Sequence, residues 1–218
     1  SETVLAQVRR LFPDAAVINS YGTTETGAGY YGAHPDGLAR PPMSVGYPQP
    51  HAEMRLVGGA GPDEGVLQIR TPTRMQGYLN RPEDTAESIT PEGWFRTGDM
   101  GTMDKDNTLF LAGRCKNMLL SANGQNIFPE EIEVVLNTLP YVQESIVVDR
   151  NGHLTALILP NLDMVGASGM DNDALNAVMA GNISKLNSEI PAYSQVTNFE
   201  LRFEPFYKTP KGSIRRFM

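Results

Sequence analysis

The sequence predicts a mixed α/β fold made of two units, a β-rich unit followed by a compact α+β unit. The 218 residues, 40% of them hydrophobic, suffice for two modest cores. Short apolar runs separated by Asp, Asn and Gly turns fill much of the first half, which is typical of β-strands. From Pro129 onward the spacing of apolar residues becomes helical, which indicates a change of architecture.

In the first half, the expected elements are one helix and four strands. Residues 3–12 carry apolar side chains on one stripe, which predicts an amphipathic helix. The short apolar runs that predict strands are Ala16–Asn19, Ala52–Val57, Gly65–Arg70 and Thr108–Leu111. Together these strands indicate a small barrel or sheet.

In the second half, we expect a helix, two strands, a helix and a strand. Pro129 followed by Glu130 and Glu131 is typical of a helix N-terminus. The remaining elements are strands at Ser145–Val148 and Leu154–Leu159, a long helix between Asp171 and Glu189, and a strand at Asn198–Phe203. This order predicts a compact α+β domain. The boundary is expected near 113–116, which gives units of 1–113 and 114–218.

The composition excludes several classes of function. A net charge of −7 without a basic stripe argues against nucleic-acid binding. No apolar run approaches the roughly 20 residues that cross a bilayer, so we expect no transmembrane segment and leave peripheral membrane contact open. Cys115 is the only cysteine, which excludes an internal disulfide and favours the cytoplasm. His34, His51 and His153 lack ligand spacing, so we assign them neither a metal nor acid–base work.

The segment Tyr21-Gly22-Thr23-Thr24-Glu25 is the first candidate site. It supplies an aromatic face, a glycine that allows close backbone approach, two hydroxyls and a carboxylate. These groups can hold a nucleotide phosphate and its magnesium ion. A turn at a strand end, with threonines making local hydrogen bonds, explains the same five residues equally well.

Four further motifs follow in order: Gly77-Tyr78 with Pro82–Thr85, then Gly93–Asp99, Gly113–Lys116 and Lys208–Gly212. With the first segment, this series resembles the adenylate-forming superfamily, which includes acyl- and aryl-CoA synthetases and peptide-synthetase adenylation domains. The resemblance runs from Phe12 to the C-terminus. It implies that the first unit is the C-terminal part of a large adenylation domain, with a barrel-like β-rich subdomain, and that the second is its lid domain.

The resemblance also implies roles for the first motif. Tyr21 is similar to the aromatic residue that lies against the adenine, and Gly22 and Thr23 belong to the same nucleotide-binding loop. Thr24 resembles the hydroxyl that contacts the α-phosphate. Glu25 resembles the carboxylate that ligates magnesium, a hard cation that prefers oxygen ligands.

Later motifs carry over in the same way. Asp99 resembles the carboxylate that binds both ribose hydroxyls, and Arg114 the arginine that reaches the ribose or phosphate. Lys116 falls where the family has the hinge of its rotating lid, although a solvated lysine is its alternative. Asn123 and Gly124 resemble the loop along which pantetheine enters, and Asn-Gly also favours a tight turn.

The last motif departs from the family pattern. Members usually carry a lysine directly after the glycine, where its charge stabilises the developing adenylate. Here Ser213 follows Gly212, and a hydroxyl cannot supply that charge. We expect Lys211 to substitute for the lysine, with Lys208 the next candidate. The alternatives are that adenylation is largely lost, or that these cations merely solvate the tail.

The resemblance implies an ATP-dependent carboxylic acid:CoA ligase that forms an acyl-adenylate and then a thioester, using ATP, Mg²⁺ and coenzyme A. The junction 113–120 with 123–127 looks most like long-chain fatty acyl-CoA ligases, so a fatty acid is the expected substrate. A stand-alone adenylation enzyme of the peptide-synthetase type, or a catalytically silent binding or regulatory remnant, are the alternatives. The family's phosphate loop does not occur in these residues, so we expect a fragment that is inactive alone.

Overall fold

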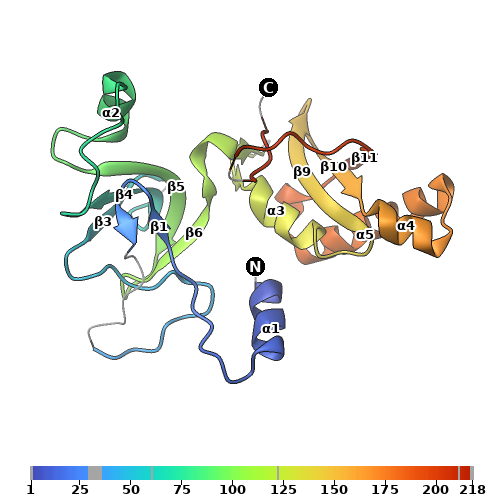
Figure 1. Ribbon diagram of the computed structural model, residues 1–218, viewed down its shortest axis with the longest axis horizontal. Coiled ribbons are helices and arrows are strands. Elements are labelled where there is room, and N and C mark those ends of the chain that lie inside the picture. Colours follow the sequence, from blue (N-terminus) through green and yellow to red (C-terminus); the bar gives the residue numbers. More distant parts are fainter. Residues whose placement is uncertain (1, 29–35, 60, 122, 211, 217–218) are drawn as a thin grey trace. The chain divides into compact units, whose positions relative to one another are not determined.

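The computed structural model describes residues 2–28, 36–59, 61–121, 123–210 and 212–216 (Figure 1). The chain forms two compact units, Ser1–Lys116 and Asn117–Met218, and each is described by itself. Among the described residues, no helix has the length and apolar character needed to cross a membrane.

The first unit is built on a four-stranded antiparallel sheet with the strand order β3-β4-β5-β6 (Figure 1). Its strands are β3 (Glu53–Gly58), β4 (Glu64–Arg70), β5 (Phe95–Met103) and β6 (Leu109–Arg114). The helix α1 (Glu2–Leu11) precedes the sheet, and α2 (Pro82–Ser88) lies between β4 and β5 in the sequence. No pairing joins β3 to β6 in the described part of the chain, so the predicted barrel-like subdomain is an open sheet.

One face of this sheet carries the core of the unit. Leu67 and Ile69 on β4 and Leu109 on β6 are fully buried and pack with Val45 and Ala52. Leu67 and Ile69 are two positions apart, so the alternation of the strand places both on the same face.

The predicted strand at Ala16–Asn19 was wrong. A strand needs a hydrogen-bonding neighbour, and these residues have none in the described structure. Side chains bind this segment instead: Asn19 Nδ2 donates to Met43 O at 3.0 Å, and the Arg40 guanidinium donates to Asn19 O. Sequence reasoning also missed β5 and α2 as elements.

The second unit is a three-stranded sheet with the order β11-β10-β9. The strands β9 (Val142–Arg150) and β10 (His153–Pro160) form an antiparallel hairpin, and β11 (Asn198–Leu201) runs parallel to β10. The hairpin turns at Asn151-Gly152, both with positive φ. The crossover to β11 contains α4 (Leu162–Ser168), which was not predicted, and α5 (Asn172–Glu189), which was.

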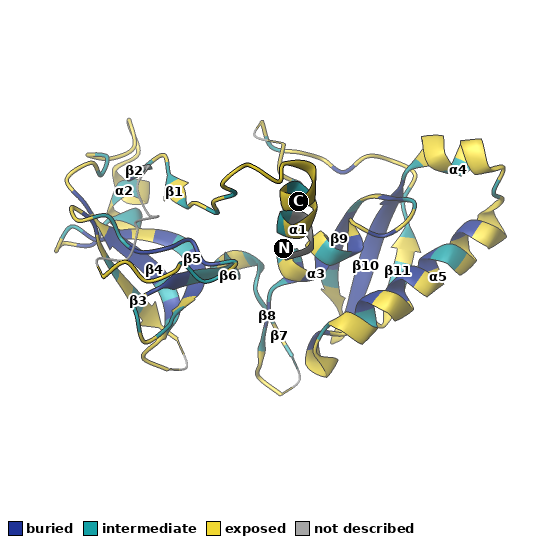
Figure 2. Ribbon diagram, turned by 90° about the horizontal axis from the view of Figure 1, so that it is seen from below, coloured by how far each residue is buried: buried dark blue, intermediate teal, exposed yellow. Residues whose placement is uncertain are grey.

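Both faces of this second sheet are covered, and Figure 2 shows β10 as a buried strand. On one face, α3 (Pro129–Leu136) and α5 pack over Val147, Ala156 and Ile158. On the other face, Phe206 and Ile214 pack on a smaller cluster. A strand buried on both faces reads as a continuous apolar run, which is how Leu154–Leu159 was identified.

The N-terminus of α5 provides a stability test. Asp171 is the N-cap residue, and its Oδ1 accepts a hydrogen bond from Ala174 N at 2.8 Å. We expect Asp171→Ala to lower the free energy of unfolding by about 1 kcal/mol, the usual cost of a lost cap. Asp173→Ala in the same first turn is the matched control, because it removes a carboxylate near the helix dipole but no cap. Equal losses in urea denaturation would contradict the capping role.

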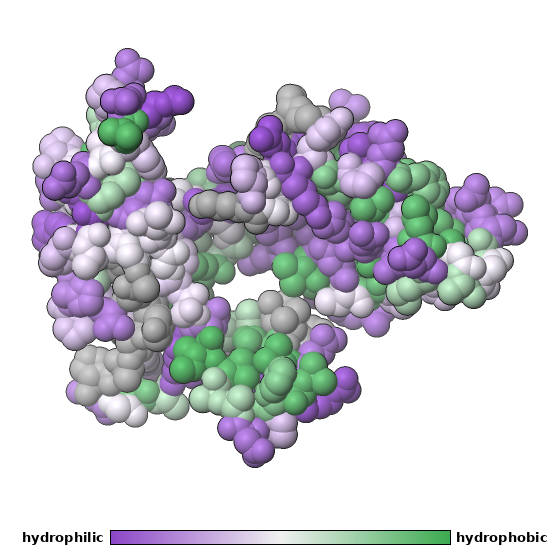
Figure 3. All heavy atoms as spheres, in the orientation of Figure 1, coloured by the Kyte–Doolittle hydropathy of each residue, from purple (hydrophilic) through white to green (hydrophobic). Residues whose placement is uncertain are grey.

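The helix α1 leaves apolar side chains exposed. Leu11 and Phe12 at its C-terminal end are 68% and 59% exposed. Figure 3 shows apolar surface gathered in this region of the chain. The helix predicted for 3–12 is confirmed, but its apolar stripe is only partly covered by described residues.

Candidate functional site

Asp99 is the centre of the candidate site in the first unit. It lies on β5, is 7% exposed, and stands opposite Arg114 in the register of β5 and β6. Arg114 Nε lies 2.8 Å from Asp99 Oδ1. The hydroxyl of Tyr21 donates a hydrogen bond to the other carboxylate oxygen, Oδ2. The structure thus brings together three residues that the sequence predicted for the nucleotide.

The Thr97-Gly98-Asp99 motif holds this carboxylate in place. Thr97 Oγ1 donates to Leu67 O at 2.8 Å and accepts from Asp99 N at 3.0 Å. Arg114 Nη1 donates to Thr97 O at 2.9 Å, so the arginine is bound at two points. Gly98 has a φ of 73°, a left-handed conformation that favours glycine. Each of the three residues of the motif therefore has a structural role at its position.

Burial affects the ionisation of both acidic groups here. Burial raises the pKa of Asp99 and the charge of Glu25 adds to this, whereas the Tyr21 hydroxyl and Arg114 oppose it. Burial and the hydrogen bond to Asp99 raise the pKa of Tyr21. Tyr21 is therefore a protonated donor at neutral pH.

The loop after Tyr21 is a tight hairpin. Two short strands, β1 (Gly22–Thr23) and β2 (Gly27–Ala28), pair across the turn. The hydroxyls of Thr23 and Thr26 lie 2.8 Å apart, and Thr26 N donates to Thr23 Oγ1 at 3.2 Å. The hydroxyl of Thr23 is thus used inside the turn, as the alternative explanation of this segment expects. Gly22 is exposed, and so is Thr24, whose hydroxyl makes no hydrogen bond to any described residue.

Glu25 is half-buried and is held by a second segment of the chain. Met75 N donates to Glu25 O at 2.6 Å, and Tyr78 Oη donates to Glu25 Oε1 at 3.0 Å. Sequence reasoning quoted Gly77-Tyr78 as a motif but gave Tyr78 no role. The one signal in the sequence was that a tyrosine stands in the motif that comes next after the motif of Glu25. That order alone could have suggested the contact.

The residues around Glu25 fit a magnesium ion that keeps water and phosphate ligands better than a metal ion held by protein side chains alone. Among the described residues, no three His, Cys, Asp or Glu side chains gather as a metal site. Mg²⁺ commonly takes one or two carboxylates and completes its shell with water and substrate phosphates. A single carboxylate beside an exposed threonine hydroxyl fits that pattern.

Lys116, the predicted hinge, lies in a 3₁₀ turn at Cys115–Asn117 and is exposed. The loop predicted for pantetheine follows in the second unit, where β7 (Leu119–Leu120) and β8 (Asn126–Ile127) form a hairpin. Asn123 and Gly124 are exposed at its tip. Gly124 has a φ of 75° and donates its N–H to Ser121 O at 2.9 Å, so a tight turn accounts for this glycine locally.

The C-terminal motif forms another hairpin, with Lys208 opposite Ile214. Lys208 forms an ion pair with Glu144. Ser213 is exposed and its backbone oxygen accepts from Thr209 N at 2.8 Å. Lys211, the predicted substitute for the missing lysine, lies outside the described residues.

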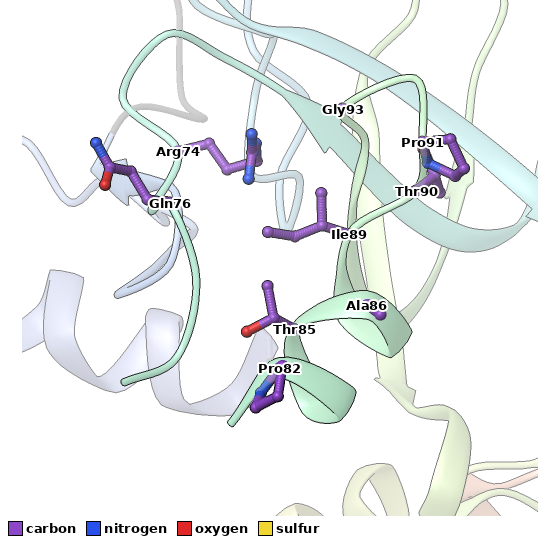
Figure 4. A pocket seen from close by; sticks show the side chains of 9 residues that line it. All are labelled: Arg74, Gln76, Pro82, Thr85, Ala86, Ile89, Thr90, Pro91 and Gly93. Atoms are coloured by element: carbon purple, nitrogen blue, oxygen red, sulfur yellow. The ribbon is translucent and has the colours of Figure 1, made fainter. Parts of the chain in front are cut away.

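Some hollows in the described part of the chain are lined by residues other than those that converge on Asp99. One of about 450 Å³ is bordered by α2 and the segments on either side of it, with Thr85 and Ile89 lining it beside Arg74 (Figure 4). Another of about 340 Å³ lies in the second unit beside the β7–β8 hairpin. Neither is lined by the residues that converge on Asp99, so we assign no ligand to them.

Comparison with known families divides the chain in two. Residues 1–79 match the family described as AMP-binding enzyme, and residues 116–218 match the AMP-binding enzyme C-terminal domain. Together these two matches cover most of the chain.

Individual relatives are similar in sequence. A long-chain-fatty-acid–CoA ligase 2 from Schizosaccharomyces pombe is 37% identical, over 69% of this chain and 23% of the relative. A 4-coumarate–CoA ligase from Vanilla planifolia is 38% identical, over 96% of this chain and 38% of the relative. The chain thus spans well under half the length of these curated relatives.

Solved structures share the fold. The A-PCP didomain of a carboxylic acid reductase from Segniliparus rugosus, in complex with AMP, has a TM-score of 0.81 at 22% identity, covering 99% of this chain and 31% of that one. The O-succinylbenzoate coenzyme A synthetase of Bacillus subtilis, in complex with AMP, has a TM-score of 0.75 at 23% identity, over 97% and 42%. The mixed α/β fold is therefore that of adenylation domains. With the family matches at both ends and the clustered Tyr21, Asp99 and Arg114, we conclude that this chain belongs to the AMP-binding enzyme family.

Proposed function

We propose that the complete gene product is an ATP-dependent carboxylic acid:CoA ligase, which forms an acyl-adenylate and then a thioester. The observation that carries this proposal is the buried carboxylate of Asp99, held between Arg114 and Tyr21, the residue that opens the loop of Glu25. The relatives support it, because their names describe acyl- and aryl-CoA ligases.

In this proposal Asp99 accepts hydrogen bonds from the two ribose hydroxyls. A carboxylate offers about four acceptor positions, and the bonds from Arg114 and Tyr21 use one on each oxygen. Acceptor capacity therefore remains for the sugar. The positive charge of Arg114 favours the ionised form of Asp99, which makes the stronger bonds. The ring of Tyr21 offers an apolar face to the adenine.

The phosphate side of the site is the exposed loop. The hydroxyl of Thr24 donates to the α-phosphate, and Gly22 lets the nucleotide approach the backbone. Glu25 is the proposed ligand of Mg²⁺, which, when bound, neutralises charge on the phosphate oxygens. Because Ser213 cannot supply a positive charge, Lys211 is proposed to do so during adenylate formation.

The two units take the family's roles in this proposal. The first, residues 1–113, is the β-rich C-terminal part of the adenylation domain. The second, residues 114–218, is the lid, which turns about Lys116 and presents Asn123 and Gly124 to the pantetheine arm of coenzyme A. The exposure of Lys116 and the position of the family boundary at residue 116 support this assignment. We also propose that the protein is located in the cytoplasm.

The acid is proposed to be a fatty acid, which the similarity to the yeast long-chain ligase supports. Aromatic acids are the second candidate class, because a 3-hydroxybenzoate–CoA ligase from Aromatoleum is 41% identical over 57% of this chain. The two classes differ in the shape of the acyl pocket, so substrate screening distinguishes them directly.

The test is to measure ATP–pyrophosphate exchange and acyl-CoA formation by the complete gene product with fatty acids of several lengths, aromatic acids and amino acids. We expect both activities, with long-chain fatty acids preferred. Exchange with amino acids and no thioester would favour a peptide-synthetase-type enzyme. Absence of exchange with every acid would refute the proposed activity and favour a silent remnant.

A further inference from the structure

Residues 73–78 form a segment, here called the strap, that is hydrogen-bonded to the loop that carries Glu25. The strap makes three hydrogen bonds to residues 25 and 26. Thr73 Oγ1 donates to Thr26 O at 2.7 Å, and Met75 N donates to Glu25 O at 2.6 Å. The third bond is the one from Tyr78 Oη to the carboxylate oxygen Oε1 of Glu25, at 3.0 Å. The strap thus fixes both the backbone and the side chain of this glutamate.

Tyr78 is itself held by α2. Tyr78 N donates to Thr85 Oγ1 at 2.9 Å, and this threonine hydroxyl in turn donates to Arg81 O at 2.8 Å. A Cβ at Gly77 would lie 2.8 Å from Thr85 Cγ2, so the close approach of strap and helix requires glycine. Figure 4 shows Thr85 on α2 facing this segment. The phenol therefore reaches Glu25 from an anchored backbone.

The contact engages only one of the two carboxylate oxygens of Glu25. Its other oxygen, Oε2, makes no hydrogen bond to any residue that the structure describes. A carboxylate with one oxygen engaged and one free is prepared for monodentate ligation.

We propose that Tyr78 is a positioning residue that keeps Glu25 a monodentate metal ligand and thereby favours Mg²⁺ over Ca²⁺. This inference rests on the proposed role of Glu25 as the magnesium ligand. Mg²⁺ requires near-octahedral geometry at about 2.0–2.1 Å, whereas Ca²⁺ accepts six to eight ligands and often binds a carboxylate through both oxygens. The hydrogen bond from Tyr78 uses one of the two acceptor positions of Oε1 and withdraws charge from that oxygen, which disfavours the bidentate mode that calcium uses.

The test compares ATP binding by the complete gene product in Mg²⁺ and in Ca²⁺, using isothermal titration calorimetry. We expect wild type to bind ATP more tightly with Mg²⁺, and Tyr78→Phe to reduce this Mg²⁺/Ca²⁺ ratio by about 10-fold, the lower end of the effect of losing one hydrogen bond to a charged group. Tyr193→Phe, at an exposed tyrosine of the second unit, is the control and should leave the ratio unchanged.

Glu25→Gln separates the inference from the proposed function. If this variant abolishes the metal dependence of ATP binding while Tyr78→Phe keeps the wild-type ratio, the positioning role is overturned and the ligase proposal stands. If Glu25→Gln keeps full metal dependence, Glu25 is not the ligand and the inference fails with that assignment. Absence of ATP binding by wild type in both metals would overturn the proposed function as well.

Discussion

Glu133→Ala should destabilise the second unit by about 3–5 kcal/mol, the usual cost of leaving a buried charge without its partner. Glu133 on α3 is 7% exposed, and its Oε1 accepts from Val147 N at 2.6 Å. The guanidinium of Arg216 donates to its other oxygen and, through Nη1, to Val147 O at 3.3 Å. Removing Glu133 leaves the N–H of Val147 without this acceptor, and leaves the largely buried guanidinium of Arg216 with Glu130, at 3.8 Å, as its remaining ion-pair partner.

Urea denaturation of this chain, followed by circular dichroism, measures the effect. Glu131→Ala, at an exposed position of the same helix, is the matched control and should cost little. The double variant Glu133→Ala with Arg216→Met should recover part of the loss, since it removes the unpaired charge as well. Similar losses for Glu133→Ala and Glu131→Ala would rule out a structural role for this ion pair.

Asp99→Ala is expected to weaken AMP binding by the complete gene product by about 100-fold or more. In the proposed site Asp99 accepts two ribose hydroxyls, and a hydrogen bond to a charged group contributes about 1.5–3 kcal/mol. Asp99→Asn should give an intermediate loss, because the amide keeps an acceptor oxygen and the shape of the side chain but not the charge.

Asp63→Ala, at an exposed turn of the same unit, is the control for the Asp99 variants. Calorimetric titration with AMP, together with the thermal midpoint of each variant, separates lost binding from lost folding. Unchanged AMP affinity in a folded Asp99→Ala variant would remove Asp99 from the nucleotide site.

Elements with a strong local pattern could be predicted from the sequence. The helices α3 and α5 and the hairpin of β9 and β10 show helical spacing or a continuous apolar run, and all four are confirmed. The central strand β5 was missed, because Gly98, Asp99 and Gly101 interrupt any alternation of apolar residues. Its strand character comes from the ladders to β4 and β6, which are tertiary interactions.

The candidate site was predicted as a set of residues but not as a geometry. Motif order identified Tyr21, Asp99 and Arg114, which the fold brings into contact. The contact between Tyr78 and Glu25 joins positions 53 residues apart and depends on how α2 holds the strap, so no local pattern reveals it. The hydroxyl of Thr23 bonds within its own turn. This was one of two interpretations of the segment, a local turn or a nucleotide-binding loop, between which its five residues alone could not decide.

The C-terminal hairpin explains how its last motif can differ from that of the family. The turn is closed by main-chain bonds, from Thr209 N to Ser213 O at 2.8 Å and from Gly212 N to Thr209 O at 2.9 Å. Phe206 and Ile214 attach it to the sheet. None of these interactions uses the side chain of Ser213, which points to no described partner. A change of the side chain at position 213 therefore removes none of the contacts that close this turn or attach it to the sheet.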